Sequence, residues 1–241
     1  MIMHCVTTSW LCGDQEIAMK GSTPHIVLLD TGITWLKQEY SNIQFAYQQS
    51  FCHASDAQDS ASHCSSMLQV LSSNLTCKSR VSLGKVLSAP GVGNPQVISR
   101  GLMWSAELFP DAVVMPLGLM KPNSSIKAAL EILANTGCKI FAAVGNPYED
   151  QKSCLYPAAY PECISVGCSR YSQVYDSWPE KPDILVDEEM VNSVKGIDGV
   201  HLGTSTATML AVAEFFNNEF CDKQDSKEIT ESTDFLPNQY G

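Results

Sequence analysis

Three polar residues spread along the chain carry the side chains that serine-based nucleophilic catalysis requires. Asp30 follows an apolar run and precedes Thr-Gly, His63 precedes Cys-Ser-Ser, and Ser205 stands within Gly-Thr-Ser-Thr-Ala-Thr. A serine hydroxyl is a poor nucleophile at neutral pH, so it needs an imidazole that takes its proton and a carboxylate that orients the imidazole. We therefore interpret Ser205 as a candidate nucleophile, His63 as its general base and Asp30 as the orienting acid.

A fourth residue could stabilise the negative charge that such an attack creates. Asn146 follows the apolar run 139–144, and its side-chain amide could donate a hydrogen bond to an oxyanion. Because a proline comes next, Asn146 could instead be a turn residue. Taken singly, Asp30 could also end a strand in a turn, His63 could be structural and Ser205 could cap a helix. Their order along one chain is what favours catalysis.

The elements that must position these residues alternate between strand and helix patterns. Short apolar, β-rich runs predict seven strands. Apolar residues at helical spacing lie between several of these runs, which is typical of parallel strands connected by helices. The pattern therefore predicts an α/β fold. The predicted strands cover residues 25–29, 43–51, 81–87, 111–115, 139–144, 163–166 and 183–186.

Two of the predicted helices carry candidate site residues. One begins near His63, with Ser62 as its cap. The other runs from Ser205 to about Phe216 and is apolar nearly all round, which predicts a central, buried helix. Its first N–H groups favour negative charge, so the Ser205 N–H would join Asn146 in an oxyanion hole. Further helices are predicted at 95–106 and from a cap at Ser124 or Ser125 through Leu133.

Together these segments resemble the subtilisin-like serine peptidases, from about His25 to about Phe216. The order Asp, His, Ser is one of three known for this machinery and is the order of that family. Further matching segments are Met-Pro-Leu-Gly at 115–118 and Tyr-Pro-Ala-Ala-Tyr-Pro at 156–161, which leads into Ile-Ser-Val-Gly at 164–167. The family usually continues with Gly-Thr-His after its catalytic His and with Pro-His after its nucleophile motif. This chain has Cys-Ser-Ser and Met-Leu at these positions, and neither difference removes a catalytic atom.

The resemblance implies a three-layer αβα fold with a central, mostly parallel sheet. It also implies a serine endopeptidase that acts on a peptide or protein substrate through a Ser205 acyl-enzyme, with His63 as general base and acid and Asp30 orienting it. A dedicated protease that processes one partner or precursor peptide is a narrower form of this hypothesis. The alternative is a catalytically inactive subtilisin-fold scaffold that binds without turnover.

The resemblance further implies where a substrate binds. Two segments would form the walls of the pocket for the side chain that precedes the scissile bond. Pro116 stands where the family commonly has Ser, and proline lacks an N–H donor but keeps a carbonyl that could accept a substrate N–H. Leu155 falls where the family has a small residue at the pocket floor, which predicts a shallow pocket that prefers small or medium side chains over Phe or Tyr. The wall residues are Met115, Pro116, Leu117 and Gly118 on one side and Ala142, Ala143, Val144 and Gly145 on the other.

The charge and cysteine content of the chain limit its partners and cofactors. The formal net charge is -11, so nucleic acid and anionic membrane surfaces would be repelled. No run of about 18 apolar residues that could span a membrane is present. The clustered Cys154, Cys163 and Cys168 lack the CxxC spacing of a zinc site, and the segment 75–87 is short compared with the calcium-bearing segment of the family. We predict neither a metal nor a cofactor. The sequence does not indicate which oligomeric state the protein adopts.

We divide the chain into an N-terminal extension (1–24), a peptidase domain (25–220) and a polar C-terminal tail without periodicity (221–241). The start of the sequence lacks the basic and apolar regions of a signal peptide. The ten cysteines are scattered through predicted strands and helices, which favours reduced, mostly buried thiols over disulfides. These features predict a cytoplasmic protein.

Overall fold

The computed structural model describes residues 23–32, 40–52, 62–88, 92–147, 151–194 and 203–231, with side chains in the last range as far as Phe220. A seven-stranded sheet has the order β2-β3-β1-β6-β7-β8-β9, and all its neighbouring strands are parallel. The α/β fold is confirmed, and each predicted strand is present with ends within two residues of those expected. The strands are β1 (His25–Asp30), β2 (Ile43–Ser50), β3 (Ser79–Lys85), β6 (Ala112–Met115), β7 (Lys139–Ala143), β8 (Ile164–Cys168) and β9 (Ile184–Val186), and β4 (Leu87–Ser88) with β5 (Val92–Gly93) forms a separate antiparallel pair.

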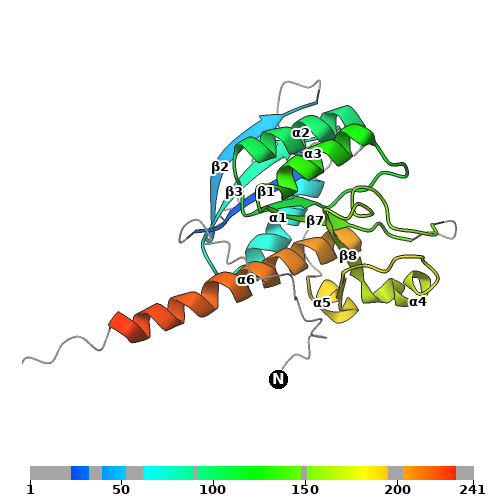
Figure 1. Cartoon of the computed structure of the whole chain (residues 1–241). Coiled ribbons are helices and arrows are strands. Elements are labelled where there is room, and N and C mark those ends of the chain that lie inside the picture. The colour runs from blue at the N-terminus through cyan, green and yellow to red at the C-terminus, as the bar shows by residue number, and fades with distance from the viewer. Residues whose placement is uncertain are drawn as a thin grey trace, which may run out of the picture.

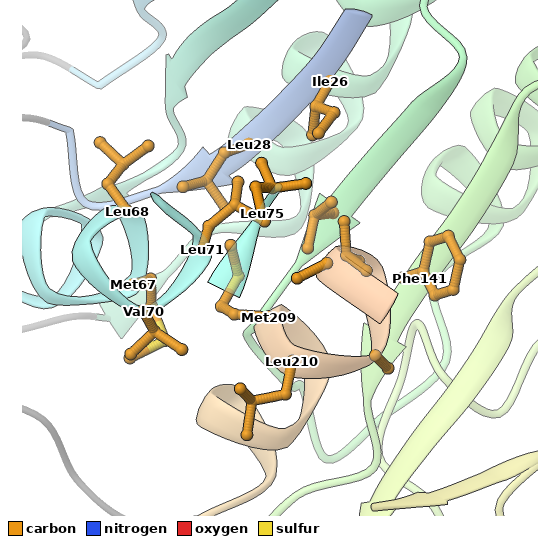
Figure 2. Packing of buried hydrophobic residues seen from close by; sticks show 14 of the residues in the cluster. Ile26, Leu28, Met67, Leu68, Val70, Leu71, Leu75, Phe141, Met209 and Leu210 are labelled. Carbon is orange, nitrogen blue, oxygen red and sulfur yellow. The ribbon is translucent and has the colours of Figure 1, made fainter. Parts of the chain in front are cut away.

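Helices cover both faces of this sheet (Figure 1). Helices α1 (His63–Asn74) and α6 (Thr204–Glu231) pack on one face, and α2 (Pro95–Glu107) and α3 (Ser124–Ala134) pack on the other. Because successive side chains of a strand point to opposite faces, β1 contributes to two cores. Ile26 and Leu28 pack with residues of α1 and α6 (Figure 2), while Val27 and Leu29 pack with those of α2 and α3. Shorter helices are η1 (Ser169–Tyr171), α4 (Ser172–Tyr175) and α5 (Glu188–Ser193).

The strand order places the candidate residues together at the carboxyl ends of inner strands of the sheet. After β3, the chain crosses from one side of β1 to the other and forms β6. In open parallel sheets, such a change of direction leaves a crevice at the carboxyl ends of the strands. Asp30 is the last residue of β1, the segment 116–118 follows β6, and Asn146 follows β7. In the sheet, β6 lies between β1 and β7, so the three segments lie together.

The starts of two helices differ from the sequence-based prediction. Ser62 has a left-handed backbone (φ 58°), and its side chain makes no capping hydrogen bond, so Ser62 is not the side-chain cap of α1. Helix α3 is capped by Asn123, whose side-chain oxygen accepts hydrogen bonds from the N–H groups of Ser125 and Ile126. The prediction of Ser124 or Ser125 was wrong because Asn is at least as good a cap as Ser and stands just before them.

Helix α6 is longer than predicted. It continues to Glu231 instead of ending near Phe216, so the first half of the predicted tail is helical. No Gly or Pro lies between these two residues, and a helix therefore has no strong signal to stop there. Figure 1 shows the last turns of α6 extending beyond the sheet. None of the described helices is long and apolar enough to cross a membrane.

Candidate active site

Asp30 and His63 form the best-defined contact of the site. The Nδ1 atom of His63 lies 2.9 Å from Oδ1 and 2.8 Å from Oδ2 of Asp30. Asp30 is fully buried at the end of β1, whereas the His63 side chain, on the first residue of α1, keeps 25% of its surface exposed. The buried carboxylate therefore fixes one ring nitrogen of His63, which leaves Nε2 as the nitrogen that can exchange a proton with a nucleophile.

Ser205 is the second residue of α6 and is partly exposed. Its hydroxyl donates a hydrogen bond of 3.0 Å to the carbonyl oxygen of Pro116. A hydroxyl has only one proton, so this contact turns the Ser205 proton away from His63 in the resting structure. The hydroxyl proton must leave this contact before His63 can take it. The Pro116 carbonyl, expected to accept a substrate N–H, thus already has a partner when no substrate is bound.

Asn146 is tied to the start of α6. Its Oδ1 accepts hydrogen bonds from the N–H of Thr204 (2.8 Å) and from the Thr204 hydroxyl (3.2 Å). Because the amide oxygen is occupied, the NH₂ group of Asn146 is left as a donor. The N–H of Ser205 is the next of the helix-start donors that have no partner within the helix. This arrangement supplies two donors next to the candidate nucleophile, as an oxyanion hole requires.

The two predicted pocket walls are adjacent but mostly present backbone. The side chains of Met115, Leu117, Ala142, Ala143 and Val144 are buried in the cores. A substrate at these walls would therefore contact main chain, as in the addition of a strand to a sheet edge.

Leu155 fills the space between the two walls. A Cβ atom added to Gly118 would lie 2.6 Å from Leu155 Cδ1, and one added to Gly145 would lie 2.5 Å from the same atom. The Leu155 N–H also donates to the Val144 carbonyl at 3.0 Å. The structure thus brings Leu155 into direct contact with Gly118 of one wall and Gly145 of the other.

Three further residues support the site and were not predicted from the sequence. Thr31 donates its N–H to Asp30 Oδ1 at 2.6 Å, and Thr204 holds Asn146 as described above. The Gln151 side chain donates to the Val144 carbonyl at 3.0 Å and so supports one wall. Thr31 and Thr204 each stand next to a predicted catalytic residue, and that adjacency was an available signal. Gln151 stands in a polar loop segment with no such signal.

The known proteins that this chain resembles in sequence are serine proteases. No family model matches the chain. It is 29% identical over 163 residues to a cuticle-degrading serine protease of Orbilia oligospora, and equally to one of Arthrobotrys oligospora. The aligned part covers 64% of this chain but only 37% and 39% of those proteins. The resemblance to subtilisin-like serine peptidases is confirmed. The aligned part of the chain thus spans less than two fifths of the length of these relatives.

A solved structure supports the fold independently. A cold-adapted subtilisin-like serine proteinase superposes with a TM-score of 0.58 at 20% identity, covering 80% of this chain and 75% of the other. The subtilisin-like, three-layer α/β fold is therefore shown.

Proposed function

We propose that this chain is a serine endopeptidase. The observation that carries the proposal is the contact of buried Asp30 with His63, at the sheet edge where the Asn146 amide is tied to the start of the helix that bears Ser205. This set of side chains provides an orienting acid, a base, a nucleophile and oxyanion donors. The named activity of the sequence relatives supports the same chemistry.

The proposed reaction proceeds through an acyl-enzyme. His63 Nε2 takes the Ser205 proton as Oγ bonds to the substrate carbonyl carbon, and the carbonyl oxygen becomes negative. The Asn146 NH₂ and the Ser205 N–H donate to that oxygen. His63 then gives its proton to the leaving nitrogen as the C–N bond breaks, and a water molecule repeats the sequence to release the acid. Asp30 keeps its charge and stabilises the imidazolium in both steps.

Labelling with a fluorophosphonate probe tests the proposal directly. We expect mass spectrometry to locate the adduct on Ser205, and Ser205→Ala and His63→Ala to abolish it. Ser105→Ala is the matched control, because Ser105 is a buried serine whose hydroxyl donates to the Gly101 carbonyl of the same helix, α2. Failure of the folded wild type to label or to cleave any peptide would instead favour the inactive scaffold, in which the Ser205–Pro116 contact is permanent.

We also propose that Leu155 makes the enzyme prefer bonds that follow small or medium side chains over bonds that follow Phe or Tyr. Its contacts with Gly118 and Gly145 leave little room for an aromatic ring between the walls. We expect Leu155→Gly to raise kcat/KM for a peptide with Phe before the scissile bond, relative to the same peptide with Ala, by about 10- to 200-fold. A peptide series read by mass spectrometry measures this ratio. Best cleavage after Phe or Tyr by the wild type would contradict the assignment.

A restricted pocket supports the narrower role of processing a partner or precursor peptide. Comparing digestion of an unfolded protein mixture with digestion of single peptides tests this role, and indiscriminate degradation would oppose it. The seven cysteines whose side chains the structure describes form no disulfide, and six of them are buried, which supports a reducing compartment such as the cytoplasm. Cell fractionation tests that location.

A further inference from the structure

Thr31 connects the two elements that carry Asp30 and His63. It follows Asp30 at the end of β1 and is 2% exposed. Its N–H donates to Asp30 Oδ1 at 2.6 Å, the same oxygen that lies 2.9 Å from His63 Nδ1. Its side-chain oxygen accepts a hydrogen bond of 3.1 Å from the N–H of Cys64. Asp30, the last residue of β1, and Thr31, which follows it, therefore contact His63 and Cys64, the first two residues of α1.

The hydrogen bond from the Cys64 N–H to the Thr31 side chain replaces a cap that the residue before α1 does not supply. A helix begins with N–H groups that have no partner inside it, and the residue before the helix usually supplies a side-chain oxygen. Ser62 supplies none, because its backbone is left-handed and its side chain makes no capping bond. The Cys64 N–H is instead satisfied by Thr31, from 33 residues earlier in the chain.

This placement sets the position of the His63 ring. His63 is the first residue of α1, so a change in its first turn moves the imidazole relative to a carboxylate that β1 holds fixed. Displacement of a catalytic group by about 1 Å can cost about 10²-fold in rate. Because Thr31 contacts both Asp30 and the first turn of α1, it fixes the position of His63 relative to Asp30.

We propose that Thr31 is a positioning residue: its hydroxyl oxygen caps α1 while its N–H orients Asp30, and together they keep His63 in hydrogen-bonding reach of the carboxylate. This assignment rests on the proposed peptidase function for its kinetic consequences, but the Asp30–His63 contact itself does not depend on turnover.

Thr31→Val tests the assignment, because valine has nearly the shape of threonine but offers no oxygen to the Cys64 N–H. We expect kcat to fall by tenfold or more with KM changed less than threefold, and the acid limb of the pH–rate profile to shift. Thr31→Ser keeps the oxygen and should restore both. Asn123→Ala is the matched control, since it removes the side-chain cap of α3. It should lower stability without altering the pH profile.

A measurement without turnover separates this proposal from the proposed function. In the Ser205→Ala background, the proton on His63 Nδ1 should give a downfield NMR signal that is lost or shifted by Thr31→Val and retained by Thr31→Ser. If the Val variant does not fold, Thr31→Ala takes its place. An unchanged signal together with an unchanged pH profile would overturn the positioning role. Failure of the wild type to cleave peptides would overturn the peptidase function and leave the NMR result decisive for Thr31.

Discussion

At the scale of single residues, Gly203 shows how an absent side chain shapes the site. It precedes α6, and its backbone passes against the Asn146 amide, so that an added Cβ would overlap Oδ1 and lie 2.8 Å from Nδ2 and 2.9 Å from Cγ. Real Cβ atoms do not approach other atoms so closely. A side chain at residue 203 would therefore force a shift of the Asn146 amide that bonds to Thr204.

Gly203→Ala should move Asn146 and weaken the oxyanion hole. We expect kcat to fall by up to about 10²–10³-fold, the cost of losing such a donor in subtilisin itself, with KM changed much less. The double variant Gly203→Ala/Asn146→Ala should be no slower than Asn146→Ala alone, since the smaller side chain removes the overlap. Steady-state kinetics of the four proteins measures this coupling. Additive losses would mean that Gly203 acts in another way.

At the scale of elements, β1 carries a buried histidine at the end opposite to Asp30. The ring Nε2 of His25 lies 2.8 Å from the Ser82 hydroxyl of β3, and the backbone N–H of His25 donates to Asp111 Oδ2 at 2.7 Å. Burial lowers the pKa of His25 below its usual value of 6.5, and the positive charge of Arg80 lowers it further, against a smaller opposite effect of Asp111. The folded protein therefore favours the neutral ring.

This lowered pKa predicts a loss of stability in weak acid. Above pH 6.5, His25 is neutral in both states, and its contribution to stability is fully present. As the pH falls from 6.5 through the lower pKa of the folded state, the unfolded chain takes up the proton first, so the free energy of unfolding decreases, by about 1.4 kcal/mol per unit of pKa difference. As the pH is lowered from 7.5 to 5, the free energy of unfolding measured with urea should decrease less in His25→Gln than in the wild type. Equal decreases in both proteins would refute the assignment to His25.

The elements also show what the sequence could predict. The strands were predictable because buried parallel strands are short apolar runs, and β1 pairs with β3 and β6 along such runs. Asp30, His63 and Ser205 could be selected as candidates from the sequence because their types and order indicate one chemistry. The cap of α1 was not, because it comes from Thr31, distant in the sequence. The rotation of the Ser205 hydroxyl toward Pro116 depends on where β6 ends relative to α6, which no local pattern specifies.

At the scale of the whole molecule, a single sheet lies between two cores and contributes side chains to both. Cys64 lies in the core with α1 and α6, and Cys138 lies in the core with α2 and α3. Both thiols are buried, and neither forms a disulfide. Because β1, β6 and β7 contribute side chains to both cores, loss of either core removes the packing of strands on which the other depends. The two faces should therefore unfold together.

Cysteine alkylation measures this cooperativity. Burial raises the pKa of Cys138 to about 12 and that of Cys154 to about 11, so few of these thiols are ionised at pH 8 even when a reagent can reach them. We expect iodoacetamide to leave Cys64, Cys138 and Cys154 unmodified in the native protein. In increasing urea, peptide mass spectrometry should find modification of all three with a single midpoint, equal to that of the circular dichroism signal. Cys138→Ala, measured in parallel, controls for any effect of modifying that core first. Modification of Cys64 at a lower urea concentration than Cys138 would show instead that the face formed by α1 and α6, which carries His63 and Ser205, opens separately, as a local unfolding unit.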